Sequence, residues 1–156
     1  MAVEDENLLL KYLSMASPYG VICQFIWAYS NETTDGEVVI TQHDDNIRCI
    51  NIHIKEIQAD YYDEWVDLEH CKPYLRPMLT MTEEEKEEMH NLLSPEGTAI
   101  YENNGIALPI NHYGEYVSYE FMNRIIQYLL KNHFDFMGLI PKGIAIEATE
   151  NNNPYK

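Results

Sequence analysis

Apolar residues recur along this chain with spacings that predict three helices. The first helix precedes a break at Pro18–Gly20, and its stripe at helical spacing consists of Leu8, Leu9, Tyr12, Leu13 and Ala16. The second begins at Thr82, which forms a capping-box pattern with Glu85, and runs to about Leu93. The third follows Ser118 and carries a stripe of Phe121, Met122, Ile125, Ile126, Leu129 and Leu130.

Other segments have the composition or the period of strands. Residues 21–27 are β-branched and aromatic, which predicts a buried strand, and residues 38–40 predict a second one. Turn chemistry at 43–46 precedes a third strand, in which isoleucines alternate with polar residues at Ile50, Ile52 and Ile54. Asn103–Gly105 predicts a hairpin between residues 98–101 and 106–108. A short strand is expected at 143–146.

Together these elements predict the α+β class, as an antiparallel β-meander packed against about three helices. We expect one domain over residues 1–150 and a disordered tail over 151–156. The isoleucine face should be buried together with Phe121, Ile125 and Leu129, because each face needs an apolar partner. Pro73 and Pro77 exclude a regular helix or a central strand over 60–76, so we expect that segment to be extended and irregular.

The charge of the chain narrows the classes of partner. Ten basic and 26 acidic residues among 156 leave a formal charge of −16, and residues 60–102 form the most acidic block. Such a balance argues against direct nucleic-acid binding, because phosphates require clustered Lys and Arg. An odd set of three cysteines indicates reduced thiols, and neither a signal peptide nor a membrane span is recognisable. The chain is therefore expected to be cytoplasmic, with no membrane partner.

Signatures of catalysis are weak. No G-x-S-x-G, C-x-x-C or phosphate-binding loop occurs, and Cys71 next to His70 is a poor candidate nucleophile because neighbours in an extended chain point apart. His133 and Asp135 are weak candidate metal ligands, since His133 can equally donate to Asp135 or to a carbonyl at the end of the helix. We expect no metal and no cofactor, and no catalytic residue is assigned.

An acidic aromatic segment is the best candidate for a binding site. Aromatic rings anchor interfaces and carboxylates steer basic partners, which favours a protein-binding face. The alternative interpretation is that these rings cover the sheet while the acids face water. The segment comprises Asp60, Tyr61, Tyr62, Asp63, Glu64, Trp65, Asp67 and Glu69. Nearby Arg76 could serve a structural role, forked onto a carboxylate or a helix end, or could bind an anion.

Three motifs resemble a family of small uncharacterised proteins from prophages and mobile elements of Bacteroides-like bacteria. They are Ser17–Val21 (SPYGV), Lys72–Thr82 (KPYLRPMLTMT) and His133–Glu147 (HFDFMGLIPKGIAIE). The family carries PYGL, KPxLRPLSxLT and HFDxxGLIxxGLAI in the same order. This chain departs from it at Val21, at Tyr74 and at Met78–Thr80. The resemblance implies expression in a bacterial cytosol from a phage or mobile element, and it transfers no activity.

Two functional hypotheses from different classes follow. The first is a non-enzymatic acidic protein that binds a protein partner with a basic surface; in a sharper version it mimics nucleic-acid charge and inhibits a host factor. The alternative is a small metal-assisted hydrolase that uses His133 and Asp135 with carboxylates elsewhere. A flat acidic aromatic face would favour the first hypothesis, and a pocket with converging His and Asp side chains would favour the second. The sequence carries no indication of an oligomeric state.

Overall fold

The computed structural model describes residues 1–30, 38–51, 55–60, 65–93, 99–103, 106–110 and 119–156, with side chains outside 27–41 and 93–121. These residues form two compact units, of which one comprises Met1–Leu75 with Met137–Lys156 and the other Arg76–Phe136. Helices and a mostly antiparallel sheet give the α+β class that the sequence predicts. A single domain over residues 1–150 stays a prediction, and each unit is described by itself.

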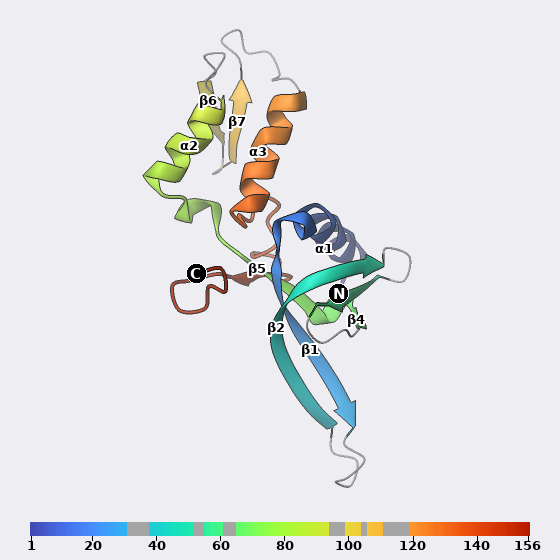
Figure 1. The fold of residues 1–156 in the computed structure, drawn as a ribbon. Coiled ribbons are helices and arrows are strands. Elements are labelled where there is room, and N and C mark those ends of the chain that lie inside the picture. Colours follow the sequence, from blue (N-terminus) through green and yellow to red (C-terminus); the bar gives the residue numbers. More distant parts are fainter. Residues whose placement is uncertain (31–37, 52–54, 61–64, 94–98, 104–105, 111–118) are drawn as a thin grey trace. The chain divides into compact units, whose positions relative to one another are not determined.

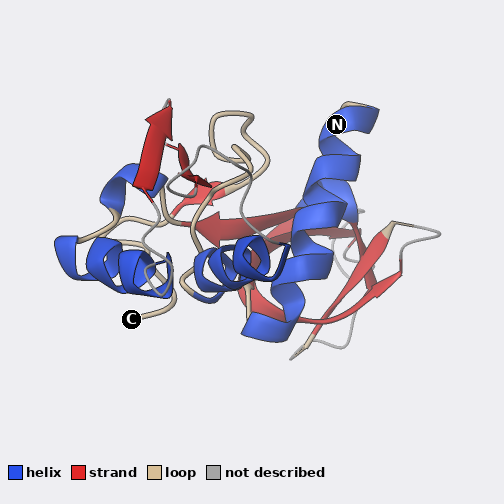
Figure 2. Ribbon diagram, turned by 90° about the horizontal axis from the view of Figure 1, so that it is seen from above, coloured by secondary structure: helices blue, strands red, loops and turns tan. Residues whose placement is uncertain are grey.

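The first unit opens with α1 (Val3–Ala16), which confirms the first predicted helix (Figures 1 and 2). Acidic residues occupy its first turn, where they favour the positive end of the helix dipole. Leu9, Tyr12, Leu13 and Ala16 are fully buried, as the periodicity of the stripe requires. A 3-10 turn, η1 (Ser17–Tyr19), follows and ends at Gly20, whose φ of 72° is open to glycine at little cost.

A six-stranded sheet makes up most of this unit, in the order β4-β3-β2-β1-β5-β8. Its strands β1 (Ile22–Ser30), β2 (Val38–Asn51), β3 (Glu56–Ala59) and β4 (Trp65–Asp67) form the predicted antiparallel meander. The turn predicted at 43–46 is wrong, because these residues continue β2 and pair with residues 22–25 of β1. Nine consecutive pairs with β1 outweigh the local turn preference of Asp and Asn.

The segment expected to be irregular contains a strand inside the sheet. After the 3-10 turn η2 (Leu68–His70), β5 (Cys71–Leu75) pairs antiparallel with β1 and parallel with β8 (Ile146–Glu147). Pro73 is accommodated because it lies opposite Cys23 at the end of the first pairing, and β8 joins only at Tyr74 and Leu75. The exclusion of a central strand here is therefore wrong.

The last residues of the chain are tied to this sheet. Tyr155 accepts a hydrogen bond from the Ile22 N–H and donates one to the Tyr74 carbonyl, each at 3.0 Å. Burial is the main cause that raises the pKa of the Tyr155 phenol. The sequence predicts a disordered tail over 151–156. The structure instead attaches this segment to the sheet, because the Tyr155 hydroxyl is hydrogen-bonded to the backbone of Ile22 and of Tyr74.

The second unit pairs two helices with a hairpin. It contains the 3-10 turn η3 (Met78–Thr80), α2 (Glu83–Leu93), β6 (Ala99–Asn103), β7 (Ile106–Ile110) and α3 (Tyr119–Lys131). The predicted hairpin is present, but Asn103, expected in the turn, is the last residue of β6 and lies opposite Ile106. The capping box at α2 is confirmed: Glu85 Oε2 accepts from the Thr82 N–H at 2.8 Å, and Thr82 Oγ1 accepts from the Glu85 N–H at 3.2 Å.

The apolar stripe of α3 packs on α2 within this unit. The cluster consists of Met81, Met89, Ile125, Tyr128, Leu129 and Phe134. We expected Ile125 and Leu129 to be buried with the isoleucine face; within the second unit they are buried in a cluster with Met81 and Met89. Ile50 is half-buried, while Ile52, Ile54, the Phe121 side chain and the Ser118 cap lie outside the described residues. Among the helices described, none has the length and apolarity needed to cross a membrane.

Candidate protein-binding surface

A solvent-facing surface of the sheet carries Trp65. Along β3 and β4 burial alternates, so that Ile57 and Val66 point into the core while Trp65 and Asp67 face outward. The register of β2, β3 and β4 aligns two rows across these strands. One row is Cys49–Gln58–Trp65 and the other is Asn51–Glu56–Asp67. We call these six residues the Trp65 face.

The Trp65 face joins an exposed ring to carboxylates. The Trp65 side chain is 47% exposed, which is unusual for so large an apolar residue. Asp67 is exposed two residues further along β4, and Glu56 lies opposite it on β3. No basic residue stands in either row. A cationic side chain could thus lie over the indole and reach a carboxylate in the neighbouring row.

The predicted acidic segment divides in the structure. Trp65 and Asp67 stand together on the Trp65 face, and Asp60 is exposed just after β3. Glu69 belongs to η2, where its carboxylate lies 3.6 Å from the Met1 amine and 3.9 Å from His70. The remaining predicted members, Tyr61, Tyr62, Asp63 and Glu64, lie outside the described residues.

Sequence reasoning missed Cys49, Gln58 and Glu56 as members of this face. The available signal was the alternation of Ile50 with polar neighbours, which indicates a wet face for that strand. It does not say which residues of β3 and β4 come to lie beside it. Only the cross-strand register supplies that information.

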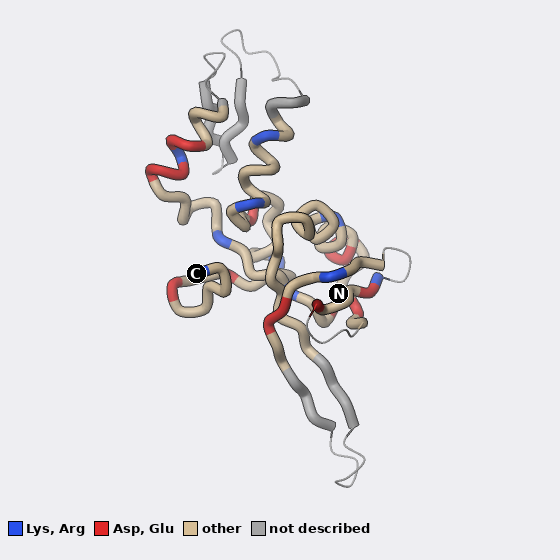
Figure 3. Tube along the Cα trace, viewed as in Figure 1, with Lys and Arg blue, Asp and Glu red and all other residues tan. Residues whose placement is uncertain are grey.

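A second acidic surface follows α2, where Figure 3 shows acidic residues gathering along the helix. Glu84, Glu87, Glu88 and Asn91 share one helix face by their spacing of three and four positions, and all are exposed. Tyr128 of α3 donates to Glu88 at 3.1 Å, and burial together with this contact raises its pKa to about 12. The adjoining Lys86 pairs with Glu83 at 2.7 Å.

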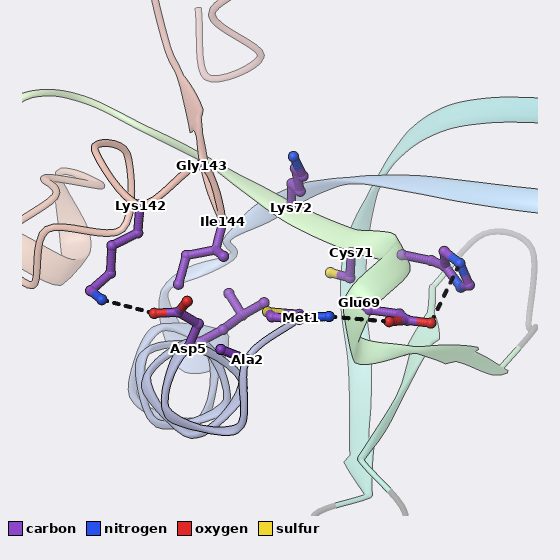
Figure 4. A pocket seen from close by; sticks show the side chains of 11 residues that line it. Met1, Ala2, Asp5, Glu69, Cys71, Lys72, Lys142, Gly143 and Ile144 are labelled. Atoms are coloured by element: carbon purple, nitrogen blue, oxygen red, sulfur yellow. Dashed lines mark hydrogen bonds and ion pairs between the residues drawn. The ribbon is translucent and has the colours of Figure 1, made fainter.

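A pocket of about 470 Å³ opens beside α1 in the first unit (Figure 4). Four of its charged groups form two pairs, Lys142 with Asp5 at 2.8 Å and Glu69 with the Met1 amine, and Lys72 also lines the pocket. Cys71 lines the pocket with a fully buried side chain, whereas His70 is 48% exposed and lies near Glu69. The pocket therefore does not bring a histidine and an aspartate together as hydrolytic chemistry would need.

The contacts of Arg76 are those of the structural role suggested by the sequence, in which its guanidinium forks onto a carboxylate. Its guanidinium donates to both Glu85 oxygens, at 2.6 and 2.9 Å, and lies 4.3 Å from the centroid of the Phe134 ring. Its backbone accepts from the Asp135 N–H and donates to the His133 carbonyl, each at 2.8 Å. The second and third sequence motifs thus meet at this residue. Because both terminal nitrogens of its guanidinium are hydrogen-bonded to Glu85, Arg76 has a structural role in the second unit.

His133 and Asp135 lie just after α3. His133 has a φ of 57°, and burial, followed by the charge of Arg76, lowers its pKa to about 4. Asp135 is buried and contacts Arg76 through its backbone. Within the described ranges, no three His, Cys, Asp or Glu side chains are grouped so as to hold a metal ion.

Comparisons with protein-family models, with curated proteins and with solved structures found no match to this chain.

Proposed function

We propose that this protein is a non-enzymatic acidic interaction protein that binds the basic surface of a protein partner through the Trp65 face. The observation that carries the proposal is the exposed Trp65 ring in register with a row that holds Glu56 and Asp67. About half of the Trp65 ring is in contact with water in the free protein. Burying this apolar surface against a partner would lower the free energy of the complex.

Arginine is the partner side chain that this arrangement suits best. Its planar guanidinium stacks on an indole and can donate two parallel hydrogen bonds to a carboxylate. On the Trp65 face the ring and Asp67 are two residues apart on one strand, so both lie on the same side of it. A lysine offers a point charge without the plane, and should bind this face more weakly.

The acidic surface along α2 supports the same class of partner by a long-range effect. Charge at −16 steers a basic protein toward the chain and raises the rate of encounter. The sharper hypothesis, inhibition of a host nucleic-acid-binding factor by charge mimicry, rests on this charge. The three motifs resemble those of a family from phages and mobile elements. This resemblance supports a location in the cytoplasm of a bacterium that carries such an element.

The test is capture of a partner from bacterial lysate, followed by rate measurements on the purified pair across a salt series. Association should slow with salt, because the Debye length falls from about 10 Å at 0.1 M to about 3 Å at 1 M. Trp65→Ala should mainly speed dissociation, by about 30-fold for an anchor worth about 2 kcal/mol. Asp67→Asn should mainly slow association and flatten the salt dependence.

Two matched controls separate this face from other surfaces. Leu79 is 90% exposed in the second unit, so Leu79→Ala tests loss of an exposed apolar side chain elsewhere. Glu87→Gln removes a charge from the α2 surface without touching the Trp65 face. A partner whose rates ignore salt, Trp65→Ala and Asp67→Asn would refute the proposal. Sensitivity to Glu87→Gln alone would move the binding site to α2.

A further inference from the structure

Strand β4 forms one edge of the six-stranded sheet. It stands first in the strand order, and within the part of the chain that the structure describes it pairs with β3 alone. An edge strand presents backbone N–H and C=O groups with which a further strand can pair. The Trp65 face therefore lies directly beside an open row of backbone groups.

The pairing with β3 decides which backbone groups of β4 point to the open side. In an antiparallel ladder, pairs of residues that exchange hydrogen bonds alternate with pairs that do not. In this register the Leu68 N–H donates to the Lys55 carbonyl at 3.0 Å, just beyond β4. Two residues back along the chain, Val66 is therefore also hydrogen-bonded to β3. The backbone groups of Trp65 and Asp67 consequently point away from β3.

The same two residues thus supply both the side chains of the Trp65 face and the backbone groups of the open edge. An antiparallel strand added at β4 would exchange about four backbone hydrogen bonds with Trp65 and Asp67. The two residues of that strand opposite them would project onto the Trp65 face, because directly opposed residues share one face of a sheet.

We infer that the partner binds the Trp65 face as an extended strand added to β4, with arginines at two alternate positions opposite Trp65 and Asp67. One guanidinium stacks on the indole and the other forks onto the Asp67 carboxylate, beside Glu56. The arginines must be two positions apart, because adjacent residues of a strand point to opposite faces. This inference rests on the proposed function and adds the way in which the partner is bound.

Charge selects a basic segment over a second copy of this chain. The sequences of β3 and β4 contain Glu56 and Asp67 but no Lys or Arg. Lys55, which precedes β3, is paired with Glu6 of α1. A second copy, with its charge of −16, would bring further carboxylates to this edge. Like charges opposed across strands are destabilising, whereas alternating arginines set unlike charges opposite each other.

Two blocked synthetic peptides added to the full chain test the spacing. The peptide TRTRT places both arginines on one face of a strand, whereas TTRRT, with the same composition and charge, places them on opposite faces. In an NMR titration TRTRT should bind about fivefold more tightly, because TTRRT loses one of the two arginine contacts. Equal affinities would overturn the inference, as would absence of TRTRT binding at about 5 mM peptide.

Methylation of the peptide nitrogens separates strand addition from binding by side chains alone. In the added strand the arginine N–H groups point to β4 and that of the central threonine points away. N-methylation of both arginines should weaken TRTRT by about tenfold or more, because two hydrogen bonds are lost. N-methylation of the central threonine should change the affinity by about twofold or less. Equal effects would refute strand addition.

Amide hydrogen exchange gives an independent readout on the protein. Val66 is hydrogen-bonded to β3 and should exchange slowly in the free chain, while Trp65 and Asp67 should exchange rapidly. Bound TRTRT should slow exchange at Trp65 and Asp67 and leave Val66 unchanged. A saturating peptide that protects neither of the two outward amides would overturn the inference.

Protein variants distinguish failure of this inference from failure of the proposed function. TRTRT should lose most of its affinity in Trp65→Ala and in Asp67→Asn, and little in the control Glu87→Gln on α2. If those two substitutions weaken binding and the position of N-methylation makes no difference, the Trp65 face stands and strand addition is refuted. If the peptide and the captured partner both ignore the two substitutions, the proposed function itself fails.

Discussion

Arg76 and Glu85 are joined by two parallel hydrogen bonds, from Nη1 to Oε1 at 2.6 Å and from Nη2 to Oε2 at 2.9 Å. The same Glu85 carboxylate accepts from the Thr82 N–H and so caps α2. Arg76 also lies over Phe134, which belongs to the apolar cluster of the second unit. One ion pair therefore connects the start of α2 to the segment that follows α3.

Removing the arginine should destabilise the second unit. Arg76→Ala leaves a largely buried carboxylate without its main partner, so we expect the free energy of unfolding to fall by about 2–4 kcal/mol. Arg76→Lys should recover only part of this, because an ammonium cannot fork. Lys86→Ala is the matched control. Its pair with Glu83 is exposed, and its loss should change stability by about 0.5 kcal/mol or less in urea unfolding.

Acid should remove the contribution of Glu85. Hydrogen bonds from Arg76, above all, hold the pKa of this carboxyl below its usual 4.5. A carboxyl with a lowered folded-state pKa stabilises the fold above the unfolded-state value and loses that effect as the pH falls through the folded-state value. The stability gap between wild type and Glu85→Gln should therefore shrink below pH 4.5. In an Arg76→Ala background the pH dependence of this gap should be much smaller, because only the hydrogen bonds with Thr82 then favour the charged carboxylate.

His133 should add a separate acid sensitivity at higher pH. Between its lowered pKa of about 4 and the ordinary 6.5, the unfolded chain binds a proton that the native ring does not. Stability should thus fall as the pH drops through this window and level off below about 4. The loss should be on the order of 1–2 kcal/mol, because partial exposure of the ring screens the effect.

His133→Asn tests this contribution without disturbing the backbone. Asparagine tolerates the positive φ of 57° at this position and does not titrate. The variant should lose the slope in urea-midpoint measurements between pH 6.5 and 4. Parallel curves for variant and wild type would show that the ring does not cause the slope.

The Tyr155 hydroxyl should stabilise the end of the sheet. Tyr155→Phe removes the acceptor of the Ile22 N–H, and an amide left without a partner costs about 1–3 kcal/mol. Tyr19→Phe serves as the control, because Tyr19 is half-exposed in η1. Thermal unfolding of both variants provides the comparison. Equal melting temperatures for them would contradict anchoring through Tyr155.

Thiol reactivity should report the placement of the three cysteines. Cys49 is exposed on the Trp65 face, while Cys23 and Cys71 are buried. Burial, with a further contribution from Cys71, raises the pKa of Cys23 well above its usual value, which disfavours the reactive thiolate. A thiol reagent should therefore modify one cysteine rapidly and two only on unfolding. Cys49→Ser should abolish the rapid phase, and partner binding should slow it in the wild type.

The sequence by itself determined the elements whose signals are local. The α1 stripe, the Thr82–Glu85 capping box and the hairpin around residues 103–106 each depend on residues a few positions apart. These interactions involve only residues that are close in sequence. They can therefore be recognised without knowledge of distant contacts.

Tertiary structure decided the rest, because strand pairing joins residues far apart in sequence. Turn-forming residues at 43–46 became part of β2 once β1 supplied nine partners, and Pro73 entered β5 at the end of one pairing and the start of another. The Trp65 face arose in the same way. Cys49, Gln58 and Trp65 carry no common local pattern, and only the register of three strands aligns them in one row.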